Sequence, residues 1–191
     1  MIYVRYTLVD AVTKVPCTQA PMTNGPVHPD GITPTFGIED SFGPNPQFYG
    51  VTEDREAVKD WMDELTDEEF FQAFKAELSA RARRKRKQVE QGGIEFGETA
   101  LRTDIESQNR IAGLVTSLQT MPDLQEVDFE AQPGKWVKLT REEAMAIGVA
   151  VSTHVQSTFT WNRTMHDKIE AITSLEDALP VVVEIASYTG K

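Results

Sequence analysis

The densest run of chain-breaking residues lies between residues 16 and 50. Seven of the ten prolines and five of the twelve glycines fall there, about one residue in three. Proline fixes φ and lacks a backbone N–H donor, and glycine is conformationally permissive, so no regular helix or strand is expected over this stretch. The pattern predicts an extended segment between more regular parts of the chain.

Four aromatic side chains lie in this segment, namely Phe36, Phe42, Phe48 and Tyr49. A free linker does not need large apolar side chains, because burial of each one gains about 1.5–3 kcal/mol. We therefore expect an attachment arm that packs against another chain, with these four residues as partner contacts. A flexible linker is the alternative that the sequence leaves open.

Regular elements are expected on either side of the arm. Residues 2–9, IYVRYTLV, are rich in β-branched and aromatic types and predict a strand. Residues 53–65 are acidic and amphipathic and predict a first helix. A capping box of Thr66 and Glu69 opens a second helix, which is predicted to run to Gln91 and to end at a Gly-Gly pair.

An apolar stripe occupies the first half of the second predicted helix and consists of Phe70, Phe71, Phe74 and Leu78. This stripe is too apolar to be left in water, and the helix is longer than any core that the short chain before it could build. The sequence therefore predicts a homo-oligomer whose interface is this stripe.

The same helix continues into a strongly basic run, Arg81–Lys87, in which six of seven residues are cationic. The formal net charge of the chain is nevertheless −11, and residues 51–80 carry ten acids against three bases. Cations in the last turns of a helix are favoured by its dipole, by about 0.3–1 kcal/mol each. Nucleic-acid-binding segments place such charges on one face or alternate them with aromatic residues, and neither is evident here. A solvated helical neck is expected, and nucleic-acid binding through Arg81–Lys87 is an alternative.

Hairpins and helices alternate after Gly92-Gly93. The stretches IEFGETALRTD and EVDFEAQPGKWVKL predict hairpins. A helix is expected after each, the second from Thr140 to about Ile172, and a short last helix follows Ser174. The predicted fold class is α+β. It comprises an N-terminal strand and extended Pro/Gly-rich arm (1–50), a long helical neck (51–93) and a compact C-terminal domain of helices with short β-hairpins (94–191).

Few residues suggest a catalytic or metal-binding site. The single cysteine, Cys17, excludes an intrachain disulfide and a cysteine zinc cluster. His154 and His166 lie about 18 Å apart along one predicted helix, so they cannot share a zinc ion, and His154 is expected to be a partly buried core residue. No carboxylate pair or serine motif suggests catalysis. We expect no enzyme, no metal, no cofactor and no membrane span.

From residue 81 onward the order of features resembles a known family. The basic helix end is followed by GGIEFGETALRTDIESQNRIAGL, then GKWVKLT, then HVQSTFTWNRTMHDKIEAITS. This order resembles an uncharacterised domain at the C-terminus of many bacteriophage tail and tail-fibre proteins. The matching positions are Gly92-Gly93, Thr103-Asp104, Ser107, Ile111, Gly113, Trp136-Val137, His154-Val155, Phe159, Ile169 and Ile172. The resemblance covers residues 81–175, and the family offers no catalytic residues to carry over.

The resemblance implies a structural protein of the virion tail, made in the bacterial host cytoplasm. Such a protein connects or forms part of the tail fibre or baseplate through contacts with other tail, baseplate or fibre proteins. Tail fibres are commonly trimeric, which favours a trimer for the predicted homo-oligomer. A tail-fibre assembly chaperone that is absent from the mature virion is the alternative.

Overall fold

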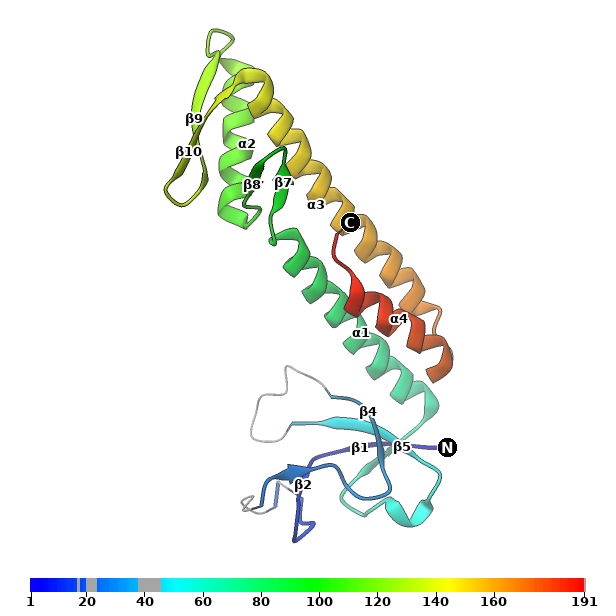
Figure 1. Ribbon diagram of the computed structural model, residues 1–191. Helices are drawn as coiled ribbons and strands as arrows, with labels where there is room; N and C mark the ends of the chain where they lie inside the picture. Colours follow the sequence, from blue (N-terminus) through cyan, green and yellow to red (C-terminus); the bar gives the residue numbers. More distant parts are fainter. Residues whose placement is uncertain (17, 20–23, 38–45, 191) are drawn as a thin grey trace. The chain divides into compact units, whose positions relative to one another are not determined.

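The computed structural model describes residues 1–16, 18–19, 24–37 and 46–190 (Figure 1). The chain divides into two compact units, an N-terminal unit of residues 1–77 and a C-terminal unit of residues 78–191. Helix α1 (Asp67–Glu90) begins in the first unit and ends in the second. Helices and small antiparallel sheets are both present, so the predicted α+β class is confirmed.

An antiparallel sheet with the strand order β4-β5-β1-β6 forms most of the N-terminal unit. Its strands are β1 (Ile2–Tyr6), β4 (Thr33–Gly37), β5 (Phe48–Thr52) and β6 (Asp63–Leu65). Two short strands, β2 (Val9–Asp10) and β3 (Pro26–Val27), pair with each other, and η1 (Arg55–Ala57) is a 3-10 turn. The predicted N-terminal strand is therefore confirmed as β1.

The sequence predicted an extended arm without regular structure over residues 16–50. For the described part of this range the prediction is wrong, because strands β4 and β5 lie within it and pair with each other. Pro34 is tolerated since β4 is an edge strand, where the missing N–H breaks no ladder. Glycine at position 50 of β5 avoids a steric clash, because a Cβ there would lie 2.7 Å from Ile32 Cγ2 and 2.8 Å from the carbonyl oxygen of Thr33. Pro34 and Gly50 are therefore compatible with the strands in which they lie.

The aromatic residues of the predicted arm pack within the N-terminal unit. Phe36 and Tyr49 are buried, and their rings stack with centroids 4.4 Å apart. Phe48 is half-buried and stacks on Tyr6 with centroids 6.0 Å apart. Phe42 lies outside the described residues. Since Phe36 and Tyr49 already fill a core of their own chain, their prediction as partner contacts is wrong.

The apolar stripe of α1 packs on this sheet. The ring centroids of Tyr3 and Phe70 are 4.3 Å apart, and those of Phe36 and Phe74 are 4.9 Å apart. Phe70 and Phe74 are buried, and Phe71 is half-buried with its ring edge toward Tyr3. The premise of the predicted oligomer interface is therefore wrong, because the chain supplies its own cover for these rings.

The predicted helical neck 51–93 also differs from the structure. Residues 53–65 form η1 and β6 instead of a helix, since β6 pairs with β1 and Asp63 forms an ion pair with Arg5 at 2.8 Å. The capping box of Thr66 and Glu69 is confirmed: the Glu69 N–H donates to Thr66 Oγ1 at 3.2 Å, and the Thr66 N–H donates to the Glu69 carboxylate at 2.9 Å.

Replacing Phe74 by alanine is expected to lower the free energy of unfolding of the N-terminal unit by about 3–5 kcal/mol, because a buried ring is lost. Gln72→Ala, on the exposed side of α1, is the matched control and should change it by less than about 0.5 kcal/mol. Denaturant melts with hydrogen exchange at β1 and β5 measure both effects. An oligomer that dissociates in Phe74→Ala without any loss of stability would contradict this assignment.

The C-terminal unit contains the second part of α1 and three further helices, α2 (Ile105–Thr120), α3 (Arg141–Glu170) and α4 (Leu175–Ser187). The hairpins are β7 (Ile94–Phe96) with β8 (Thr99–Leu101) and β9 (Glu126–Gln132) with β10 (Lys135–Thr140). Both predicted hairpins and all three predicted helices are present. The capping box of Thr140 and Glu143 at the start of α3 is formed as well.

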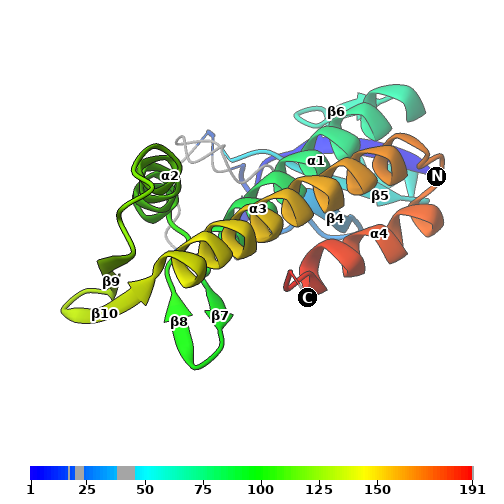
Figure 2. The same cartoon turned by 90° about the horizontal axis from the view of Figure 1, so that it is seen from above.

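Helix α3 lies beside both α4 and the second part of α1 (Figures 1 and 2). Buried side chains of these helices are Leu78, Ala82, Met165, Ile169, Ala178, Val181 and Ile185. A second cluster lies between α2, α3 and the hairpins and consists of Leu101, Ile111, Ala131, Ile147 and Val151. Leu78, the fourth residue of the predicted oligomer stripe, is therefore a core residue of this unit.

Helices α2 and α3 approach closely at Gly148. A Cβ on Gly148 would overlap Val115 Cγ2, and the β-branched valine has little freedom to move away. The helical Gly113 has open space around its Cβ position. The two glycines therefore respond differently to the same added methyl group.

Gly148→Ala is expected to lower the stability of the C-terminal unit by about 1–3 kcal/mol through overpacking. Gly113→Ala should raise it by roughly 0.5–1 kcal/mol, because alanine is the better helix former. Thermal and denaturant unfolding of the two variants tests the difference in sign. Stabilisation by both substitutions would rule out the tight α2–α3 contact.

Candidate functional site

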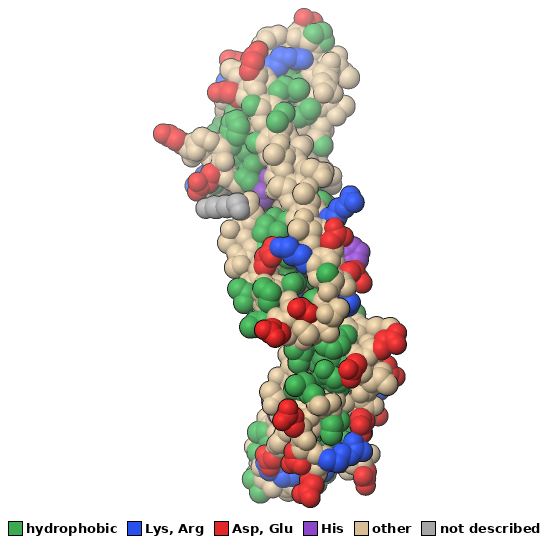
Figure 3. All heavy atoms as spheres, turned by 90° about the vertical axis from the view of Figure 1, so that its right-hand side faces the viewer, with side chains coloured by type: hydrophobic (Ala, Val, Ile, Leu, Met, Phe, Trp, Pro, Cys, Tyr) green, Lys and Arg blue, Asp and Glu red, His purple; other side chains and the backbone are tan. Residues whose placement is uncertain are grey.

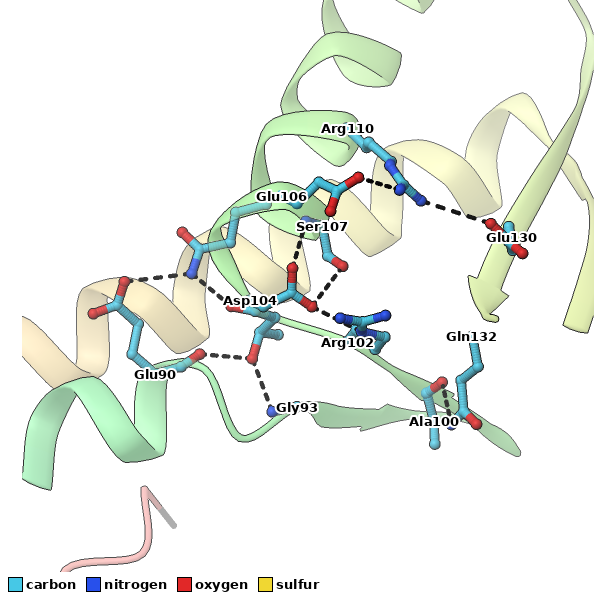
Figure 4. Close-up of polar contacts among 12 residues, drawn as sticks. Glu90, Gly93, Ala100, Arg102, Asp104, Glu106, Ser107, Arg110, Glu130 and Gln132 are labelled. Atoms are coloured by element: carbon cyan, nitrogen blue, oxygen red, sulfur yellow. Dashed lines mark hydrogen bonds and ion pairs between the residues drawn. The ribbon is translucent and has the colours of Figure 1, made fainter. Parts of the chain in front are cut away.

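Several residues that carry the family resemblance meet where α1 ends and α2 begins (Figure 4). Thr103 is completely buried, and its Oγ1 donates to the carbonyl oxygen of Glu90 at 2.6 Å and accepts from the Gly93 N–H at 2.8 Å. Gly93 has φ of +88°, and a Cβ there would lie 2.9 Å from the carbonyl oxygen of Leu101. One hydroxyl thus joins the last turn of α1 to the segment that enters α2.

Asp104 caps the N-terminus of α2. Its carboxylate accepts from the Ser107 N–H at 3.1 Å and from Ser107 Oγ at 3.0 Å. The backbone hydrogen bond from Ser107 is the main cause that lowers the pKa of the Asp104 carboxyl below its usual value, and Arg102 beside it acts in the same direction. Gln108 Nε2 completes the junction by donating to the Thr103 carbonyl oxygen at 2.7 Å and to Glu90 Oε1 at 3.3 Å.

The end of α1 is also tied to α3. His154 Nε2 lies 3.1 Å from the carbonyl oxygen of Val89 and 3.2 Å from that of Glu90. Both partners are acceptors, so this nitrogen carries the proton and donates. The imidazole thereby satisfies carbonyl groups at a helix C-terminus, as cationic and donor side chains do there. His154 is partly buried, as predicted from the sequence, and its role here is structural.

An open pocket of about 700 Å³ lies beside this junction, with Asp104, Arg102 and His154 among its lining residues. The polar groups of Asp104 and His154 already take part in the contacts described above, which stabilise the junction. In the described ranges, no group of three or more His, Cys, Asp or Glu residues could hold a metal ion. Nor does any helix in the described part of the chain have the length and apolar character to cross a membrane.

The basic run Arg81–Lys87 is not evenly solvated. Ala82 within it is buried, and Arg86 is partly buried, pairs with Glu90 and lies 4.2 Å above the ring of Phe159. Arg83 and Lys87 point to solvent. The expectation of a free, solvated neck is therefore wrong here, because this part of α1 packs on α3 and presents cations on its outer side.

A groove of about 670 Å³ runs between α1 and α3, and we call it the α1–α3 groove. Its α1 side contributes Ser79, Ala82 and Arg83, and its α3 side contributes Gln156, Phe159, Thr160, Asn162, Arg163, His166 and Ile169. Phe159 is 49% exposed although it is aromatic. The groove combines a positive rim with an accessible apolar ring.

A second groove, the α2–α3 groove, has a volume of about 730 Å³. Its apolar lining residues are Ile111, Ala112, Val115, Met145, Val149, Val151 and Val155. Val149 is 65% exposed. Other exposed apolar side chains of the C-terminal unit are Ile105, Met121, Trp136, Leu179 and Val183. Figure 3 shows one face of the molecule, on which hydrophobic side chains reach the surface among charged ones.

A family model described as "Domain of unknown function (DUF4376)" matches residues 73–186, from the middle of α1 to the end of α4. The chain belongs to this DUF4376 family. Residues 81–175, whose order of features was singled out in the sequence, fall inside the matched residues. Comparison with curated proteins and with solved structures gave no match.

The structure brings some of the sequence-predicted site residues together, but in a core. Phe70 and Phe74 meet Phe36 in the N-terminal unit, Phe71 lies against Phe70, and Leu78 lies in the other unit. Sequence reasoning missed the α1–α3 groove. A signal for it exists: Phe159, Arg163 and His166 follow an i, i+4, i+7 spacing, which places one aromatic and two basic side chains on one helix face.

Thr103→Val is expected to lower the free energy of unfolding by about 1–3 kcal/mol, since it leaves the Gly93 N–H and a Glu90 carbonyl lone pair without the buried hydroxyl. Thr164→Val is the matched control, because its exposed hydroxyl donates only to the Thr160 carbonyl oxygen of its own helix. Denaturant unfolding and hydrogen exchange of the Gly93 amide measure the effect. Equal stability of both variants would show that the junction does not depend on Thr103.

Proposed function

We propose that the protein is a structural component of a bacteriophage tail that connects, or forms part of, the tail fibre or baseplate through protein–protein contacts. The resemblance of residues 81–175 to tail and tail-fibre proteins supports this proposal. The structural observation that supports it most is the open, apolar α2–α3 groove, with Val149 exposed in its lining.

The composition of this groove suits a protein partner. Seven of its fifteen lining residues have apolar side chains, and the polar ones, such as Gln108 and Thr116, are uncharged. A partner helix or strand that places apolar side chains in such a groove gains about 1.5–3 kcal/mol for each large side chain buried. Contiguous exposed apolar surface of this kind marks interaction sites in soluble proteins.

The proposed assembly is a homo-oligomer, with a trimer favoured by the resemblance to tail fibres, and it also contacts other tail, baseplate or fibre proteins. Phe70 and Phe74 take no part in these contacts, because they pack inside their own chain. The proposed location is the virion tail, after synthesis in the host cytoplasm. Attachment is assigned to residues 1–50, which lie in the N-terminal unit before the residues that the family model matches.

Val149→Asp, introduced into the phage genome, is expected to reduce incorporation of the protein into particles several-fold, because a carboxylate in the apolar groove opposes docking. Thr164→Asp is the matched control on the exposed surface of α3 and should be incorporated normally. Mass spectrometry of purified virions measures both. Absence of the unmodified protein from virions that need it for assembly would contradict a structural role and identify an assembly chaperone instead.

A further inference from the structure

The ionisable side chains that line the α1–α3 groove are all basic. Arg83 and Arg163 line it, together with His166, which lies 3.8 Å from Glu170. No carboxylate is among the lining residues, and neither arginine forms an ion pair with any described residue. The groove thus presents positive charge in a chain whose net charge is −11.

The remaining lining of this groove suits a peptide segment. Ala82 and Ile169 are buried at its base, and Phe159 is exposed with the guanidinium of Arg86 above its ring. Arginine and aromatic side chains are enriched at the centres of protein interfaces. Asn162 Oδ1 is buried and has no hydrogen-bond partner among the described residues, so a backbone N–H of an incoming segment could satisfy it.

The matching charge lies in the N-terminal unit. Residues 1–77 contain 14 acidic and 5 basic residues, a net charge of −9, whereas residues 78–191 contain 16 and 14, a net charge of −2. The residues between Glu53 and Glu69, which we call the acidic segment, include nine carboxylates, and all nine are exposed. Asp63 pairs with Arg5 and Glu64 with Arg55, which leaves Glu53 and Asp60 among those without an ion pair in the described structure.

We propose that the α1–α3 groove binds the acidic segment of a second copy of this chain. The proposal deepens the structural role proposed above and names one of its partners. Each copy carries one groove and one acidic segment, so the contact is head-to-tail. Such a contact closes into a ring when the rotation between copies allows it, and a three-membered ring is one such closure. Complementary charges accelerate and orient the encounter, while Phe159 and the apolar base contribute burial.

The first measurement uses the full chain without a partner. Sedimentation velocity from about 1 to about 100 μM at low salt should show a mass that increases with concentration. Raising the NaCl concentration from about 50 to about 500 mM should weaken association at least about tenfold, because exposed ion pairs are screened. A monomer at all concentrations, or an oligomer insensitive to salt, overturns the proposal. A contact between the groove and the acidic segment of the same chain overturns it as well.

Charge reversal locates the two surfaces. Arg83→Glu with Arg163→Glu in the groove should weaken association at least about tenfold, and Glu53→Lys with Asp60→Lys in the acidic segment should do the same. Lys87→Glu with Lys135→Glu is the matched control, because it changes the net charge equally on exposed residues outside the groove. The control should associate far more strongly than the groove variant. Equal loss in both overturns the assignment to the groove.

Mixing supplies the decisive outcome. The groove variant and the acidic-segment variant should each fail to associate alone, yet a 1:1 mixture should recover association, because the reversed groove now faces a reversed segment. A mixture that stays monomeric overturns the head-to-tail contact. If the groove instead binds duplex DNA and loses this on Arg83→Glu with Arg163→Glu, the partner is nucleic acid and the proposal is wrong. Incorporation into virions is measured separately. The outcome of the association experiments therefore does not decide whether the proposed tail role is correct.

Discussion

One apolar stripe on α1 contributes buried side chains to both units. Phe70 and Phe74 serve the β-sheet of the N-terminal unit, whereas Leu78 and Ala82 serve the helices of the C-terminal unit. A helix buries only the stripe that faces a neighbour, so the opposite side of α1 stays in water. Arg83, Arg84 and Lys87 are on that solvent side, and the α1–α3 groove forms at its border.

The junction after α1 has a different physical basis, because it depends on hydrogen bonds among buried and partly buried polar groups. A helix end leaves carbonyl oxygens without intrahelical partners. Here Thr103 and His154 both donate to the last turn of α1, and Gly93 permits the sharp exit of the chain. The role that the structure gives to the Gly-Gly and Thr-Asp positions is in folding, since Gly93, Thr103 and Asp104 all take part in the hydrogen bonds of the junction. The two open grooves lie elsewhere on α3.

The sequence predicted the elements of the C-terminal unit well, because their signals are local. The capping box at Thr140 and the glycines at hairpin turns depend on residues a few positions apart. The N-terminal sheet could not be predicted in this way, since Pro34 is acceptable only on an edge strand and Gly50 only beside Ile32, and both facts depend on distant pairing. The same limit explains the error over Phe74: its hydrophobic character was evident, but whether its cover came from the same chain or from another was not. For the candidate sites, the sequence shows that Phe159 and Arg163 share one helix face. That both lie near Arg83 is known only from the tertiary structure.

Charge distribution connects the fold to the proposed self-association and separates it from nucleic-acid binding. Binding to a phosphate backbone depends on neutralising many phosphates with many cations, and the N-terminal unit, at net −9, opposes the approach of a nucleic-acid duplex. The same acidic unit is the natural counterpart of a groove whose basic lining residues are Arg83, Arg163 and His166. A short carboxylate-rich segment needs only a few cations beside an accessible aromatic ring, and the groove offers this combination. The large negative charge that counts against DNA as a partner therefore favours a second copy of the chain.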